Sequence, residues 1–185
     1  MKMLSSQMNP HFIFNSLSSI QEFVLANETD KVLDYLSEFA GLMRQNLENS
    51  MLPHITLSNE IQFLRTYLTL ERTRFNNVFD YELRIRVAAP ETIMIPPMLI
   101  QPFLENAIIH GLRKSPRPGK LVLEIQETEE SLKCSIMDNG VGREASLAIP
   151  KNGHRSMAMS NIEARMELLN MEFGVDVFSV AIEDL

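Results

Sequence analysis

The hydrophobic period of the chain changes near residue 79, and this change limits the possible folds more than any other feature. Before that point, apolar residues recur every three or four positions, which predicts amphipathic helices. From Phe79 onward, apolar residues at 81, 83 and 85 alternate with charged residues at 82, 84 and 86, which predicts a half-buried strand. We therefore expect an α+β protein in which a helical first part precedes helices that cover one face of a mixed sheet.

The first two predicted helices form a hairpin. The first spans about 10–26 and has an apolar seam made of Ile13, Leu17, Ile20 and Val24. A polar stripe runs beside this seam and contains His11, Asn15, Ser18 and Glu22. After a break at 27–30, the second helix carries one apolar face, formed by Val32, Leu33, Leu36, Phe39, Ala40, Met43 and Leu47. Two helices cannot bury both apolar faces alone, so we expect the hairpin to dimerise into a four-helix bundle.

The remaining elements predict a second domain. A third helix, capped by Thr56 or Ser58, is expected to run to about Phe75. Helices are expected at 102–112 and 157–170, and further strands at 121–128, 132–137 and 175–182. We place the boundary after residue 55, with the hairpin at 1–55 and an α/β sandwich at 56–185.

The overall composition excludes several classes of function. A net charge of −7 and a pI near 5.1 argue against a nucleic-acid-binding surface. The longest apolar run, at 93–100, is short and contains two prolines, so neither a membrane span nor a secretory signal is expected. The single cysteine, Cys134, excludes an internal disulfide. We therefore expect this chain to be soluble and intracellular.

Two later segments carry groups suited to nucleotide chemistry. On the helix at 102–112, the polar side presents Glu105, Asn106 and His110 within about one and a half turns. Such a set can hold hydrated magnesium through the amide oxygen, orient a proton acceptor and meet a phosphate, although many amphipathic helices simply present a solvated polar face. Asp138, Gly140 and Gly142 follow a predicted strand, and glycines there allow a ligand to approach the backbone closely. Ordinary hairpin turns also match this short pattern.

A third segment follows a polar stretch at 143–155 that is expected to form a flap. Ser156, Ala158 and Asn161 lie at the start of the helix predicted over 157–170. Small residues at the N-terminus of a helix are suited to receiving phosphates.

Four motifs in order resemble those of the LytS-type sensor histidine kinases of two-component systems. They are QMNPHFIFNSL (7–17), PPMLIQPFLENAIIHG (96–111), DNGVG (138–142) and SMAMSNIEARMELL (156–169). This resemblance implies a Bergerat-type ATP-binding domain after the dimeric hairpin. It implies that His11 is the phosphorylated histidine and Asn15 the amide of the same motif. In the ATP site it assigns magnesium binding to Asn106, an acidic catalytic role to Glu105 and adenine recognition to Asp138, with Gly140 and Gly142 as the first glycine box and His110 facing the nucleotide.

The chain departs from the family pattern at two places. Ser156, Ala158 and Asn161 stand where a second glycine box is usual, and the methyl group of Ala158 restricts the backbone and crowds a phosphate lying against it. Ile109 replaces the basic residue that commonly precedes the motif histidine, which removes one candidate phosphate contact.

The resemblance implies ATP- and Mg²⁺-dependent autophosphorylation of His11, followed by transfer to an aspartate of a response regulator of the LytTR type. It also implies a homodimeric cytoplasmic core whose longer parent protein reaches the inner membrane through segments absent from this chain, and a domain that lacks its last strand. Two alternatives stay open: a dimeric signalling module that binds nucleotide poorly, and a Bergerat-fold ATPase that hydrolyses ATP.

Overall fold

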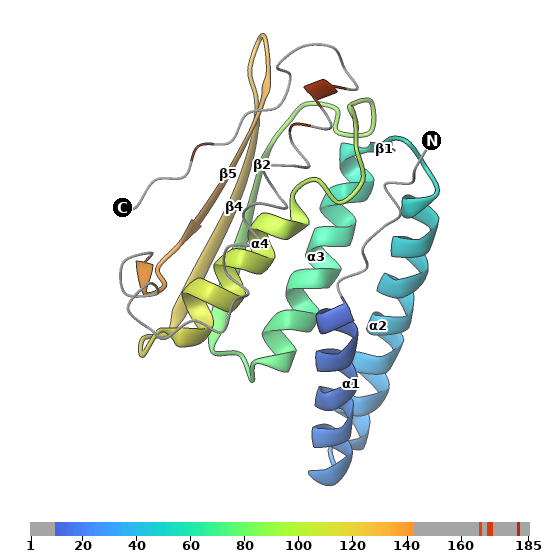
Figure 1. Cartoon of the computed structure of the whole chain (residues 1–185), viewed down its shortest axis with the longest axis vertical. Coiled ribbons are helices and arrows are strands. Elements are labelled where there is room, and N and C mark those ends of the chain that lie inside the picture. Colours follow the sequence, from blue (N-terminus) through green and yellow to red (C-terminus); the bar gives the residue numbers. More distant parts are fainter. Residues whose placement is uncertain (1–9, 143–166, 168–169, 172–180, 182–185) are drawn as a thin grey trace.

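The computed structural model describes residues 10–142, 167, 170, 171 and 181, apart from the side chains of Pro10, His11 and Lys114. In chain order the main helices are α1 (Pro10–Leu25), α2 (Thr29–Ser50), α3 (Leu57–Arg74) and α4 (Gln101–Asn106). The strands are β1 (Ile55–Thr56), β2 (Phe79–Arg86), β3 (Met94–Ile95), β4 (Gly119–Glu127) and β5 (Leu132–Asp138) (Figure 1). The α+β class and the change from helices to strands after α3 are confirmed.

The larger sheet is mixed, as the sequence predicts. Its strand order is β2–β4–β5, with β2 parallel to β4 and β5 antiparallel to β4. Parallel strands need a long crossover connection, and the segment that contains α4 provides it here. Figure 1 shows α3 and α4 on the same side of this sheet, with the hairpin of α1 and α2 beyond α3. β1 and β3 pair separately as a short antiparallel ribbon that the hydrophobic pattern does not predict.

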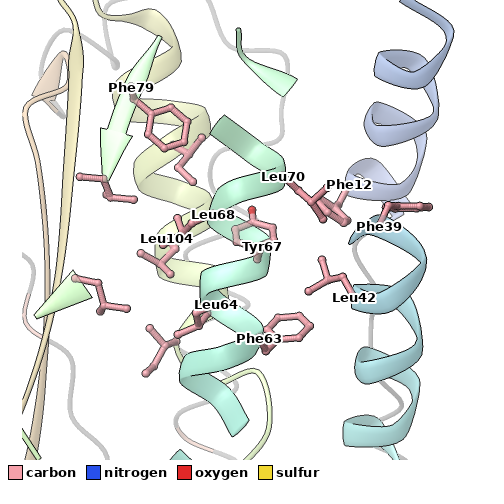
Figure 2. Close-up of a cluster of buried hydrophobic side chains, with 14 of the residues drawn as sticks. Phe12, Phe39, Leu42, Phe63, Leu64, Tyr67, Leu68, Leu70, Phe79 and Leu104 are labelled. Atoms are coloured by element: carbon pink, nitrogen blue, oxygen red, sulfur yellow. The ribbon is translucent and has the colours of Figure 1, made fainter. Parts of the chain in front are cut away.

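α3 is the central element of the core. Its N-terminus is capped as predicted by Thr56, whose hydroxyl accepts a hydrogen bond from the backbone N–H of Asn59 at 3.2 Å. Figure 2 shows Phe63 and Tyr67 on the side of α3 that faces the hairpin, while Leu64 and Leu68 lie on the opposite side, toward Leu104 of α4. α3 therefore joins the hairpin to the layer that carries the predicted nucleotide motifs.

The hairpin packs through a different stripe of α1 from the predicted seam. The buried residues of α1 are Phe12, Ser16, Ser19 and Phe23. Two residues of the seam are left outside, Leu17 at 46% exposed and Val24 at 56% exposed, whereas Ile13 and Ile20 are half-buried against the core. The aromatic stripe is preferred because the ring of Phe12 packs against those of Phe39, at 6.1 Å, and Tyr67, at 5.3 Å.

α2 likewise has one buried face and one exposed apolar face. It buries Tyr35, Phe39, Leu42, Asn46 and Asn49 against its neighbours in the chain. Three residues of its predicted apolar face, Leu33, Leu36 and Leu47, are 45–60% exposed. Among the described residues, the hairpin therefore has a second apolar face that remains exposed.

The helix predicted at 102–112 exists, but it is not one regular α-helix. α4 ends at Asn106, a π-helical turn spans Ala107–Gly111, and a 3₁₀ turn spans Leu112–Lys114. The N–H of Leu112 donates to the carbonyl of Ala107, five residues earlier, and this bond widens the turn. The predicted strand at 175–182 and most of the predicted helix at 157–170 lie outside the described residues, although Glu167 and Asn170 are helical.

Candidate active site

Glu105 and Asn106 lie at the end of α4, where the α-helix gives way to the π turn. Both side chains are half-buried, as is that of His110 within the π turn. Single π turns inside helices often occur at functional sites because they change the direction of the side chains that follow. The carboxylate, amide and imidazole predicted to act together are thus carried by one short, irregular helical segment.

The end of the π turn meets the end of β5. The N–H of Val141 donates to the carbonyl of Gly111 at 3.4 Å. A Cβ atom on Gly111 would lie 2.6 Å from Oδ1 of Asp138, and one on Gly140 would clash with the backbone of Gly111. At Gly140 only glycine fits, whereas a side chain at Gly111 would require the carboxylate of Asp138 to move. The structure therefore brings the 101–111 motif and the 138–142 motif into direct contact, as the predicted site requires.

The turn after β5 is fixed by its own side chains. Oδ1 of Asp138 accepts a hydrogen bond from the N–H of Gly140 at 2.9 Å. The amide of Asn139 accepts from the N–H of Lys120 at 2.6 Å and donates to the carbonyl of Pro118 at 3.1 Å. Gly142 has a φ of +72°, a conformation that favours glycine. Asp138 is exposed at the strand end, so its carboxylate can also accept a hydrogen bond from a ligand amine.

Burial makes Glu105 a weak acid with a pKa suited to proton transfer. Desolvation is the main cause, and it raises the pKa of this carboxyl from its ordinary value of 4.5 to about 7. The negative charge of Glu71 raises the pKa further, and the positive charge of Arg74 opposes this rise. A group that titrates near neutrality can accept a proton from a reacting imidazole and later release it.

Glu71 and Arg74 form an ion pair on α3 that the sequence analysis missed. Nε of Arg74 donates to Oε1 of Glu71 at 3.0 Å, and a second bond joins Nη2 to Oε2. Both side chains are buried, with exposed fractions of 9% and 1%, and the guanidinium stacks 4.0 Å above the ring of Phe75. The available signal was the three-residue spacing of opposite charges on a helix that is otherwise apolar on two sides.

The position of the predicted phosphoacceptor is only partly described. His11 is the second residue of α1, and its neighbour Phe12 anchors this end of α1 to Tyr67 of α3. The side chain of His11 lies outside the described residues, as do Ser156, Ala158 and Asn161. Through Gly111, the structure brings the segment that carries Glu105, Asn106 and His110 into contact with the turn of Asp138 and Gly140. It does not test the other predicted positions.

Comparison with known proteins supports a family assignment. A family model described as "Histidine kinase" matches residues 1–79. The chain is 34% identical over 142 residues to "Sensor histidine kinase/phosphatase LytS" of Staphylococcus aureus, and 32% identical over 141 residues to "Sensor protein LytS" of Staphylococcus epidermidis. The chain is similar to the LytS-type sensor histidine kinases, and these matches support its membership of that family.

The similarity covers most of this chain but a small part of its relatives. Each of the two matches spans 76% of the chain and 24% of the relative, so the chain corresponds to about a quarter of the length of the LytS proteins. Within the part that the structure describes, no helix is both long enough and apolar enough to cross a bilayer.

Proposed function

We propose that this chain is the kinase core of a LytS-type sensor, which uses ATP and Mg²⁺ to phosphorylate His11 and then passes the phosphoryl group to an aspartate of a response regulator. The observation that carries this proposal is the contact of Gly111 with Asp138 and Gly140. This contact joins the segment with Glu105 and Asn106 to the turn after β5. The mixed sheet with helices on one face supports a Bergerat-type site at this junction.

The residues at the junction fit a magnesium nucleotide. The amide oxygen of Asn106 is a ligand of the kind that Mg²⁺ accepts alongside water and phosphate oxygens. Among the described residues, no cluster of three or more histidine, cysteine or acidic side chains could hold a metal ion. Bound Mg²⁺ would neutralise the charge on the phosphates. Asp138 would accept a hydrogen bond from the adenine amine, while the absence of side chains at Gly111 and Gly140 preserves the shape of this edge.

His11 and Glu105 would carry the proton and phosphoryl transfer. A neutral imidazole of His11 attacks the γ-phosphorus, the bond to the β-phosphate oxygen breaks, and ADP leaves. Glu105 polarises the attacking imidazole or orders a water next to it, and its pKa of about 7 suits this role. His110 lies on the π turn between Asn106 and Gly111, where it can meet a phosphate. Positioning and charge neutralisation supply most of the catalysis in reactions of this type.

Dimerisation of the hairpin is part of the same proposal. Leu17 and Val24 of α1, together with Leu33 and Leu36 of α2, present apolar surface that a second copy of the hairpin would cover in a four-helix bundle. We also propose that the regulator is of the LytTR type and that further segments of the longer parent protein attach this core to the cytoplasmic membrane.

A labelling experiment tests the proposed reaction. The chain is incubated with γ-labelled ATP and Mg²⁺, and we expect label that is lost in acid and kept in base, as for a phosphohistidine. Replacing His11→Gln should abolish this label while ATP binding persists. His54→Gln is the matched control, because His54 lies in the connector between α2 and β1 and should not be labelled. Label that remains on the His11 variant would overturn the assignment.

The same preparation separates the kinase from a silent signalling module. Asn106→Ala should remove the Mg²⁺ dependence of ATP binding, and Asp138→Asn should weaken adenine recognition by about 1–3 kcal/mol, since one hydrogen bond loses its partner. The departure at Ala158 motivates the silent module. If calorimetry detects no ATP binding up to millimolar concentration and Ala158→Gly restores it, the silent module is the correct function.

A further inference from the structure

The loop that precedes α4 has few backbone donors, and a side chain from α3 takes two of them. Pro96 and Pro97 have no N–H group. Of the next three residues, Met98 donates its N–H to Oε2 of Glu60 at 3.0 Å, and Ile100 donates to Oε1 at 3.2 Å. One carboxylate therefore binds the backbone of the loop at two places, residues 98 and 100.

Glu60 is well placed to hold this loop rigidly. It is fully buried, with an exposed fraction of 0%, and lies in the first turn of α3. That turn is itself fixed: Thr56 caps it, and the N–H of Leu57 donates to the carbonyl of Ile93 at 2.8 Å. Ser58 donates its N–H to the carbonyl of Pro90 at 3.0 Å. The carboxylate thus projects from a backbone that is tied to the segment just before the loop.

The loop has a conformation that requires such support. Met98 has a φ of +54°, although it is not a glycine. Residues held in this region cost free energy and persist only where their surroundings determine the conformation. The hydrogen bond from the N–H of Met98 to Glu60 is one such determinant, and the two preceding prolines limit the alternatives.

The loop sets the start of α4. Ile100 is the N-cap residue of the helix, and its carbonyl accepts hydrogen bonds from Phe103 at 3.1 Å and from Leu104 at 3.4 Å. Its own side chain provides no cap. Because α4 has six residues, Glu105 and Asn106 follow directly after the turn that Ile100 begins. A displacement of Ile100 would therefore be transmitted to both residues.

We propose that Glu60 is a positioning residue for the phosphate side of the nucleotide site, because its two backbone hydrogen bonds fix the start of α4 and thereby place Glu105 and Asn106. This inference rests on the proposed function. The segment is held at two ends: Glu60 holds the start of α4, and the contact between Gly111 and the turn at Gly140 holds the end of the π turn. The first support serves the magnesium and phosphates, and the second serves the adenine.

The test compares two ligands on the intact chain. In Glu60→Gln the amide keeps one acceptor oxygen and turns an NH₂ group toward the other backbone N–H, so one of the two bonds is lost. We expect the affinity for Mg²⁺–ATP, measured by calorimetry, to fall about tenfold, as for a buried donor left unsatisfied. The Mg²⁺ concentration at half-maximal labelling of His11 should rise. The affinity for adenosine, which has no phosphates, should stay within about twofold.

Thr56→Ala is the matched control for stability. It removes the N-cap of the same helix and destabilises the fold, but it leaves both hydrogen bonds of Glu60 in place. We compare the variants at a temperature at which both are folded by circular dichroism. Equal losses of Mg²⁺–ATP and adenosine affinity in Glu60→Gln, or the same change in Thr56→Ala, would overturn the positioning role.

Two further outcomes distinguish a failure of the proposed function from a failure of the positioning role alone. If the unmodified chain binds neither ligand, the proposed function fails and the inference fails with it. If the unmodified chain binds both ligands and Glu60→Gln changes neither affinity, only the positioning role is wrong. Should Glu60→Gln not fold, Glu60→Asp offers a second route, because it keeps the carboxylate but withdraws it by one methylene group from the two N–H groups of the loop. It should also raise the Mg²⁺ concentration at half-maximal labelling.

Discussion

The hairpin and the unit formed by α3, α4 and the larger sheet differ in how completely a single chain buries their apolar side chains. α3 has its apolar residues buried between the hairpin and α4, and its charged pair Glu71–Arg74 is enclosed. The hairpin buries one aromatic stripe and leaves leucines exposed on the other side, such as Leu17 and Leu36. The second unit thus buries its apolar side chains within one chain, whereas the hairpin leaves apolar surface that the proposed second copy would cover.

The largest effect is expected where the hairpin lacks a partner. Replacing Leu17→Glu and Leu36→Glu together should convert the proposed dimer to a monomer, because charges would lie at the centre of its apolar interface. The two residues are 46% and 45% exposed in the single chain, so the fold should tolerate the change. Light scattering after size exclusion gives the mass. Ser18→Glu, on the polar stripe of α1, should remain dimeric, and a monomeric unmodified chain would contradict the proposal.

The next effect concerns the charged pair inside the second unit. Arg74→Met should lower the free energy of unfolding by about 3–5 kcal/mol, because Glu71 would be left as a buried charge without its cation. Chemical denaturation measures the loss. Arg84→Met is the control: Arg84 pairs with Glu82 at 2.8 Å and 2.9 Å on the exposed surface, and its loss should change stability little. Similar losses in both variants would show that enclosure of the Glu71–Arg74 pair is unimportant.

Two glycine-to-alanine substitutions, one in each region, should change the stability of the fold by smaller amounts and in opposite directions. Gly140→Ala should destabilise the fold by about 1–3 kcal/mol and abolish nucleotide binding, because its Cβ would collide with the backbone of Gly111. A Cβ on Gly41, on the exposed side of α2, would meet nothing within 4 Å. Gly41→Ala should therefore stabilise the helix by about 0.5–1 kcal/mol and leave nucleotide binding unchanged. Thermal unfolding and calorimetry distinguish the two, and equal effects would contradict the contact at Gly140.

The smallest effect is a shift in pH dependence. Labelling of His11 should rise as pH increases through about 7, since Glu105 accepts a proton only when ionised. Removing both charges in Glu71→Gln/Arg74→Met should move the midpoint to lower pH, because the effect of Glu71 on the pKa of Glu105 exceeds that of Arg74. His11 is present in both proteins, so its own titration does not produce the difference. An unchanged midpoint would exclude the coupling between α3 and Glu105.

The same pKa shift has a consequence for stability. Because the folded pKa of Glu105 lies above its ordinary value of 4.5, its contribution to stability is fully present below pH 4.5. That contribution is lost as the pH rises toward about 7, where the buried carboxyl ionises. Glu105→Gln should remove this part of the pH dependence of unfolding.

The sequence predicted the regular elements well because their periods are local properties. The helices of the hairpin, the cap at Thr56 and the three main strands follow from apolar spacing and from one hydroxyl at a helix start. The sequence did not predict which face of the hairpin packs against the rest of the chain. The buried stripe of α1 contains two serines beside Phe12 and Phe23, so its apolar spacing is a weaker signal than that of the seam. In the structure Phe12 packs against the rings of Phe39 and Tyr67.

The candidate site likewise has features that the sequence predicts and features that only the tertiary structure reveals. By itself the sequence singled out the residues that we propose carry the chemistry, because Glu105, Asn106 and Asp138 occur in recognisable motifs whose polar groups stand beside apolar ones. Only the tertiary structure decided how they are held: the π turn, the contact of Gly111 with Gly140, and Glu60 beneath the loop before α4. The physical reason is that the last two supports join residues about 30–40 positions apart, and that all three involve backbone groups, which have the same donors and acceptors in nearly every residue and leave little signal in a single sequence.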